Sequence, residues 1–214
     1  DITRALNQID PLPAGQPELA PVYLLRASLR LSVGRVTEAA VDLNALSAVD
    51  DTRSPVLALQ SIIAVVQNDA VRALELARQA VAADASGAAA ALALSYAQQA
   101  QFAVEGALAT LQSAVRHLPD NALLWARLAE LYLSVAELDA ALEAAQRATQ
   151  LGPDLAQTRT VLGFAYLAQI KIRQAEEAFE QAIELNQAAP LPRLGLGLAT
   201  IRRGELDKGR RQIE

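Results

Sequence analysis

Apolar residues recur at helical spacing through most of the chain, and the pattern is clearest between residues 122 and 155. Four residues there follow the i, i+3, i+4, i+7 spacing of one helical face: Trp125, Leu128, Ala129 and Tyr132. Three small residues form a second helical stripe further on: Ala141, Ala145 and Ala148. Gly152 and Pro153 then end the second helix and turn the chain. The segment therefore predicts a hairpin of two helices.

The same pattern returns in residues 156–189, with Leu162, Gly163 and Tyr166 in the first helix and Ala175, Phe179 and Ala182 in the second. A small residue recurs every 34 residues along the chain: Ala5, Ala39, Ala73, Ala107, Ala141, Ala175 and Gly209. A fixed period of this length is typical of solenoids of stacked helical hairpins, where a small side chain marks the closest approach of two helices. We therefore expect an all-α solenoid.

The period divides the chain into units without any insertion. Residues 1–19 are interpreted as the end of a preceding unit plus a proline-rich loop, and the units that follow are 20–53, 54–87, 88–121, 122–155, 156–189 and a truncated 190–214. The prolines between residues 11 and 17 predict a loop longer than the other turns between units. We expect all units to form one solenoid domain, excised from a longer protein.

Two units depart from the pattern in their first helix. In the first unit Arg26 and Arg30 stand at two of the repeated places, and a separate apolar stripe is formed by Val22, Leu25, Leu29 and Val33. This stripe predicts a helix rotated by about one residue. In the second unit Gln60 stands where Leu is expected, and the apolar row is Val56, Leu59, Ile63 and Val66. We expect a similar shift there.

Composition agrees with a helical array that has a thin core. The 46 alanines favour helices, while three Phe, four Tyr and one Trp supply little bulk, so packing depends on close helix approach. The net charge of −5 argues against a nucleic-acid or anionic-membrane surface. The longest apolar stretches are too short to span a bilayer. The lack of Cys excludes a disulfide and fits either cytoplasm or periplasm.

These residues resemble the tetratricopeptide repeat (TPR) family, whose 34-residue pattern places Trp, Leu-Gly, Tyr, Ala, Phe or Tyr, Ala and Pro at fixed positions. The resemblance covers nearly the whole chain. The family's small residue at the eighth place of each unit is kept throughout: Ala27, Ser61, Ser95, Ala129, Gly163 and Gly197. It implies a right-handed α-α superhelical solenoid of about six stacked TPR hairpins, truncated at both ends.

A second resemblance concerns the amino-acid sequence of core segments rather than any functional motif. Residues 57–69, 93–102, 158–171 and 190–206 are similar to bacterial TPR proteins that carry a sensor-like region related to ferric-citrate regulators, some of them described as parts of envelope transport systems. This resemblance favours the bacterial periplasm or cell envelope over the cytoplasm, and the sequence leaves the compartment open.

The chain offers little catalytic chemistry. It has one His and no Cys, and His117 stands at a predicted helix end, where an imidazole usually caps carbonyls or faces water. The run Gly195-Leu196-Gly197 lacks the third Gly and the preceding strand of a nucleotide loop. The cationic residues between Arg202 and Arg211 are interleaved with acidic ones and indicate a solvated helical end. We expect no enzyme activity, cofactor or metal site.

The TPR resemblance implies that the first helix of each unit lines the binding surface. Its groove places hold Leu24, Ser28, Leu31, Ile62, Val65, Leu92, Tyr96, Gln99, Glu130, Leu133, Phe164, Leu167, Leu198 and Ile201, and also Leu123 and Leu194. The set is mostly apolar, which favours a peptide or helix as the partner. Glu130 could receive an Arg or Lys of the partner, although a solvated surface Glu is the alternative interpretation.

Other interpretations compete with a peptide-binding groove. The Lys and Asn residues with which one TPR subgroup holds terminal carboxylates are missing from these places, so that mode of binding is rejected. The apolar groove residues could instead be buried against adjacent helices. The chain could also be a structural spacer or self-assembly module within a larger bacterial protein, associating through its truncated ends.

Overall fold

The computed structural model describes residues 2–12, 19–46 and 53–213. Within these ranges it contains thirteen helices and no strand. The helices are α1 (Ile2–Ile9), α2 (Ala20–Ser32), α3 (Val36–Ala45), α4 (Arg53–Val66), α5 (Ala70–Ala83), α6 (Ala88–Ala100), α7 (Val104–His117), α8 (Ala122–Ser134), α9 (Leu138–Leu151), α10 (Ala156–Ala168), α11 (Ile172–Leu185), α12 (Pro190–Arg202) and α13 (Leu206–Ile213). Most of the proline-rich loop predicted at 11–17 lies outside the described residues.

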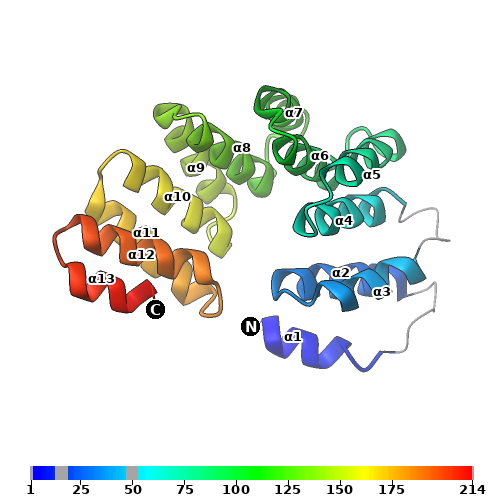
Figure 1. Ribbon diagram of the computed structural model, residues 1–214, viewed down its shortest axis with the longest axis horizontal. Coiled ribbons are helices and arrows are strands. Elements are labelled where there is room, and N and C mark those ends of the chain that lie inside the picture. The colour runs from blue at the N-terminus through cyan, green and yellow to red at the C-terminus, as the bar shows by residue number, and fades with distance from the viewer. Residues whose placement is uncertain (1, 13–18, 47–52, 214) are drawn as a thin grey trace. The chain divides into compact units, whose positions relative to one another are not determined.

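The helices group into two compact units, Asp1–Thr110 (unit 1) and Leu111–Glu214 (unit 2), and the division falls within α7. In each unit consecutive helices pack as pairs, and the first helices of neighbouring pairs also contact each other (Figure 1). The pairs α8–α9, α10–α11 and α12–α13 in unit 2 fall within the predicted windows that start at residues 122, 156 and 190. The predicted domain boundaries themselves remain a prediction. None of the described helices is long and apolar enough to cross a membrane.

Local signals in the sequence explain several helix ends. Asn121 caps α8, because its Oδ1 accepts hydrogen bonds from the backbone nitrogens of Leu123 and Leu124, both at 3.1 Å. Asp69 caps α5 by accepting from the nitrogen of Arg72 at 3.1 Å. These caps satisfy amide groups that have no partner inside the helix.

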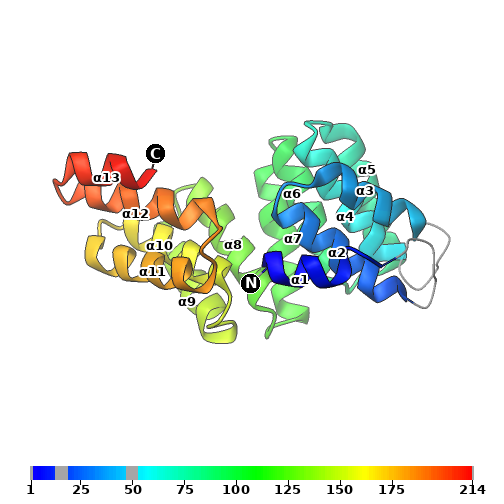
Figure 2. The ribbon, with the colours of Figure 1, turned by 90° about the horizontal axis from the view of Figure 1, so that it is seen from below.

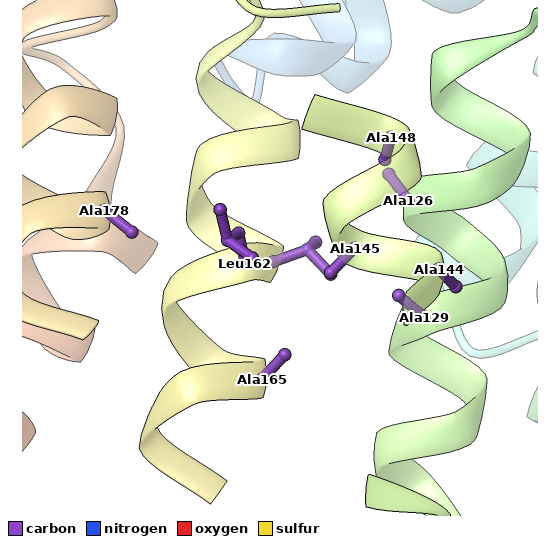
Figure 3. Close-up of a cluster of buried hydrophobic side chains, with 9 residues drawn as sticks. Ala126, Ala129, Ala144, Ala145, Ala148, Leu162, Ala165 and Ala178 are labelled. Carbon is purple, nitrogen blue, oxygen red and sulfur yellow. The ribbon is translucent and has the colours of Figure 1, made fainter. Parts of the chain in front are cut away.

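The cores of both units are built largely from alanine. In unit 2 one cluster joins Ala126 and Ala129 of α8, three alanines of α9, Val161, Leu162 and Ala165 of α10 and Ala178 of α11. Figure 3 shows Leu162 pointing toward Ala145, with Ala126 next to Ala148. Trp125 and Tyr132 pack against this cluster while partly buried. The predicted stripes of this segment therefore do face the core.

The recurring small residues lie where helices approach most closely. In α12 and α13 a Cβ built on Gly209 would come within 2.6 Å of the carbonyl oxygen of Gly197. The Phe179 ring occupies the space that a Cβ on Gly163 or on Gly195 would need, at 2.5 and 2.3 Å. Figure 2 shows α12 and α13 side by side. Ala39, Ala73, Ala107, Ala141 and Ala175 are fully buried, whereas Ala5 is only half-buried.

The predicted rotation of the first helix in the first unit is wrong. Arg26 and Arg30 of α2 are buried, while Leu25 and Val33 of the proposed stripe are exposed. The helix keeps the common register because both guanidinium groups are paired with the carboxylate of Asp42 on α3, at 2.7 Å in each case. A buried charge is tolerated when it is paired and hydrogen-bonded in this way.

These arginines also bind the end of α1. Nη1 of Arg26 donates to the carbonyl oxygens of Ile9 at 2.9 Å and Leu12 at 2.8 Å, which lie at and beyond the helix C-terminus. The carboxylate of Asp10 accepts from Arg30 at 2.9 Å and from Arg35 at 2.7 Å. We call Asp10, Arg26, Arg30, Arg35, Glu38 and Asp42 the ionic cluster. Hydrogen bonding to Arg35 lowers the pKa of Asp10, and hydrogen bonding to Asp42 raises the pKa of Arg26.

The predicted shift in the second unit is also absent. Ser61, at the family's small-residue place, is fully buried, and its Oγ donates to the carbonyl oxygen of Ala73 at 2.8 Å. Val56 and Ile63 of the apolar row are buried too, but Val66, the last residue of α4, is exposed. The helix is apolar on more than one face, so its apolar row does not reveal its orientation.

The turns within the helix pairs repeat one backbone conformation every 34 residues, although the residue type at this position varies. Six residues spaced by 34 have positive φ: Gly34, Asn68, Phe102, Ala136, Ile170 and Gly204, with φ of 79°, 60°, 61°, 60°, 61° and 101°. Glycine and asparagine adopt this left-handed conformation readily, whereas bulky residues do so at a cost. The turns therefore share one geometry despite their different side chains.

Candidate functional site

The first helices of the pairs in unit 1 carry the predicted groove residues on neighbouring elements. Helix α4 contacts both α2 and α6. Seven predicted residues are half-buried: Leu24, Leu31, Ile62, Val65, Leu92, Tyr96 and Gln99. Ser28 is exposed, and its Oγ donates to the carbonyl oxygen of Leu24 at 2.9 Å. Because Leu24, Leu31, Ile62 and Val65 also pack against the alanine clusters beneath them, only part of each side chain reaches the surface.

In unit 2 the corresponding residues lie on α8, α10 and α12, and α10 contacts both of its neighbours (Figure 1). Glu130, Leu133, Phe164 and Ile201 are half-buried. Leu194 and Leu198, one turn apart on α12, are 37% and 39% exposed, and Leu123 on α8 is exposed to a similar degree. We call Leu123, Glu130, Leu133, Phe164, Leu194, Leu198 and Ile201 the first-helix face of unit 2.

Leu167 does not belong to this face. Its side chain is only 8% exposed and lies in a core cluster with Ala175, Phe179 and Ala199. Leu167 stands late in α10, where the helix approaches α11 and α12, so it serves packing rather than access.

Phe164 is held in a fixed position by the core. Its ring meets that of Phe179 edge-on, with 4.9 Å between the centroids and an interplanar angle of 73°. This arrangement matches the favourable geometry of aromatic pairs. Phe164 is therefore packed against the core while half-buried, on the helix that contacts α12 with its accessible leucines.

Glu130 has partners within its own unit. Its Oε2 accepts from Nη1 of Arg127 at 3.0 Å, and its Oε1 accepts from Nε2 of Gln157 at 3.5 Å. Arg127 is buried, so this ion pair lies at the boundary between core and surface. A partner's cation would have to share the carboxylate with Arg127.

The residues examined as candidates for catalysis or phosphate binding make contacts within the protein. His117 is exposed, and its Nδ1 lies 2.8 Å from the carbonyl oxygen of Ser113. Among the cationic residues between Arg202 and Arg211, Arg203 pairs with Glu176 at 2.7 Å and with Glu205 at 2.8 Å. Lys208 pairs with Glu205 at 3.3 Å. Hydrogen bonding to Lys208 lowers the pKa of Glu205. Arg203 and Lys208 are therefore paired within the protein, and Arg202, Arg210 and Arg211 are exposed.

The comparisons with known proteins concern the fold and one repeat. Residues 156–188 match the family model of the tetratricopeptide repeat. None of the curated proteins compared with the chain matches it. A thermophilic TPR protein of Thermus thermophilus superposes with a TM-score of 0.73 at 21% identity, covering 85% of this chain and 99% of its own.

Two further solved structures are similar. PilF of Pseudomonas aeruginosa gives a TM-score of 0.64 at 15% identity over 91% of this chain and 89% of its own. MamA of Desulfovibrio magneticus RS-1 gives 0.57 at 14% identity over 75% and 90%. The resemblance to envelope transport proteins is not borne out by these comparisons. Residues 156–188 are therefore a tetratricopeptide repeat, and the described helices have the fold of tetratricopeptide-repeat proteins.

Proposed function

We propose that the chain is a non-catalytic interaction scaffold that binds an apolar peptide or helix along the first helices of its repeats. Proteins with this fold are in general protein-interaction scaffolds. The observation that carries the proposal is the first-helix face of unit 2, where α12 carries accessible leucines and the neighbouring α10 carries Phe164, packed edge-on against Phe179.

The chemistry of this face favours an amphipathic helix or an extended apolar segment. Leu194 and Leu198 are spaced i, i+4, so they form a short apolar ridge of the kind that takes the i, i+3, i+4 anchors of a partner helix. Because Phe164 already packs against Phe179, we expect it to lose little conformational freedom on binding. Glu130 adds an acidic edge that suits a partner with a nearby Lys or Arg.

The test uses peptides selected against the whole chain from a displayed random library, whose dissociation constants are then measured by calorimetry. Leu198→Asp should weaken the selected peptides at least about tenfold, as expected for loss of a buried interface anchor. Leu206→Asp is the matched control, because Leu206 is also an exposed leucine but belongs to α13, the second helix of its pair. The control should bind as tightly as the unmodified protein.

If Leu198→Asp and the unmodified protein bind the peptides equally tightly, the first-helix face of unit 2 is not the binding site. The self-assembly alternative has its own signature. If light scattering shows concentration-dependent dimers that Leu198→Asp disrupts, the face binds a second copy of the chain rather than a peptide.

A further inference from the structure

A small polar cavity opens between α3, α4 and α5 in unit 1, with a volume of about 180 Å³. Its apolar lining consists of Ala40, Ile63 and Ala64, and its polar lining consists of Asn44, Gln60, Gln67 and Arg72. We call it the Gln60 notch. The groove residues of α4, Ile62 and Val65, do not line it. A ligand of this notch is therefore independent of a partner on the first-helix face.

The notch exists because of one departure from the repeat pattern. Gln60 occupies the place held by Leu94, Leu128 and Leu162 in later units. Leu162 fills the space against the second helix of the preceding pair, as Figure 3 shows for its approach to Ala145. The polar Gln60 faces α3 in the corresponding position, and a hollow remains beside it.

The polar groups of the notch are available to a ligand. Among the described residues, none hydrogen-bonds to the side chains of Gln60, Gln67, Asn44 or Arg72. Gln60 is half-buried, and Asn44, Gln67 and Arg72 are exposed, so a ligand can reach all four side chains from solvent. A position that breaks the local rule of the fold without compensation is where a binding role is expected.

The lining also selects the chemistry of the ligand. Of the described residues that line the notch, Arg72 alone is charged, so the notch favours an anion. A guanidinium group and amide N–H groups together match the planar oxygens of a carboxylate. The volume of about 180 Å³ is below the range of roughly 300–1,000 Å³ typical of cofactor and drug-sized ligands, which leaves room for one side chain. We propose that the Gln60 notch binds the carboxylate of an acidic side chain of a partner protein.

The binding test titrates the whole chain with three probes at millimolar concentration. Binding is monitored through the side-chain amide signals of Gln60 and Gln67 in ¹H–¹⁵N NMR spectra. N-acetyl-glutamate amide should give saturable shifts at both residues. Its neutral isostere, N-acetyl-glutamine amide, should bind at least about tenfold more weakly, because it lacks the charge that Arg72 attracts. Acetate should also bind more weakly than the glutamate probe, since it cannot fill the notch.

Gln60→Leu is the decisive variant, because leucine restores the residue that later units carry at this place. It should melt at the same temperature as the unmodified protein or higher, and it should lose the shifts of Gln67. Loss of binding could then not be attributed to unfolding. Arg72→Gln should bind both capped probes equally weakly, whereas Arg78→Gln, an exposed site on the same helix, should behave like the unmodified protein.

Two results would overturn the proposal: unchanged binding by Gln60→Leu, or equal affinity of the unmodified protein for the charged and the neutral probe. Acetate that binds as tightly as the glutamate probe would assign the notch to a free small carboxylate and overturn the side-chain assignment. None of these results depends on the first-helix face, so they are distinct from failure of the proposed function.

Discussion

Phe102 and Ile170 occupy a turn position that suits glycine or asparagine. Their φ values are both 61°, and they are 92% and 71% exposed. Burial of the side chain therefore contributes little to offset the backbone cost. Nothing in the structure explains why large apolar residues stand here. The neighbouring glutamines do support these turns, since Gln101 and Gln169 donate to the carbonyl oxygens of Ala70 and Leu138, both at 3.0 Å.

Phe102→Asn should stabilise the protein. A left-handed backbone costs an ordinary residue about 1–2 kcal/mol, and asparagine tolerates it, so we expect a gain of about 1 kcal/mol in urea unfolding. Val71→Asn is the control, because Val71 is 75% exposed but lies within α5. If both variants gain equally, the effect comes from removing surface hydrophobicity rather than from the backbone.

Asp42→Ala should be severely destabilising. Asp42 is 1% exposed and is the shared counter-ion of Arg26 and Arg30. Removing one member of a buried ion pair leaves an uncompensated charge and costs about 3–5 kcal/mol. Urea unfolding measures the loss, and Arg26→Ala combined with Asp42→Ala should cost less than the sum of the single changes. Strict additivity would show that the two residues are not coupled.

At the scale of elements, α1 differs from the other helices in how it is held. Leu6 is its buried apolar anchor among the side chains described, and the ionic cluster binds its C-terminal end. Helix termini need partners for their carbonyl groups, and here buried arginine provides them instead of a glycine cap. The attachment of α1 therefore depends on charge more than the attachment of other helices does.

Acid should release α1 before the rest of the array. Hydrogen bonds from Arg35 lower the pKa of both Asp10 and Glu38 in the folded protein. Their stabilising contribution is therefore complete above about pH 4, near their unfolded values, and is lost as the pH falls through their folded pKa. Hydrogen exchange at pH 7, 5 and 3 should show α1 losing protection at the lowest pH.

Asp10→Asn provides the control for this effect. The variant should lose protection in α1 already at pH 7 and should show less change with pH, while protection of α8 to α12 stays as in the unmodified protein. An α1 that is equally protected in both proteins at every pH would show that apolar contacts alone hold it.

At the scale of the whole chain, the described helices contact only near neighbours in sequence, and this holds within each of the two units. Stability in such arrays is approximately a sum of terms for each repeat and each interface. Damage to one repeat is therefore expected to remain local.

Phe179→Ala tests this locality. Phe179 is fully buried and fills the space next to Gly163 and Gly195, so its removal should cost about 3–5 kcal/mol. Hydrogen exchange should accelerate in α10, α11 and α12 and remain unchanged in α2 to α5. Phe102→Ala, which removes an exposed ring, should change neither region. Faster exchange throughout unit 1 would contradict the nearest-neighbour description.

The sequence by itself determined the helical repeat, because the period depends on side-chain size and small residues must recur wherever helices touch. It also located much of the first-helix face, since repeat position specifies which side of a helix points away from the core. It could not place Leu167, because the depth of burial depends on how closely the next helix approaches.

Only the tertiary structure showed how the protein accommodates the charged and polar residues that depart from the repeat pattern. Arg26 and Arg30 predicted a rotated helix because their partner, Asp42, is 12 or more residues away and belongs to another helix. Gln60 left a cavity whose shape depends on α3 and α5 as well as on its own helix. Periodicity describes one helix at a time, whereas ion pairs and cavities depend on what several helices bring together.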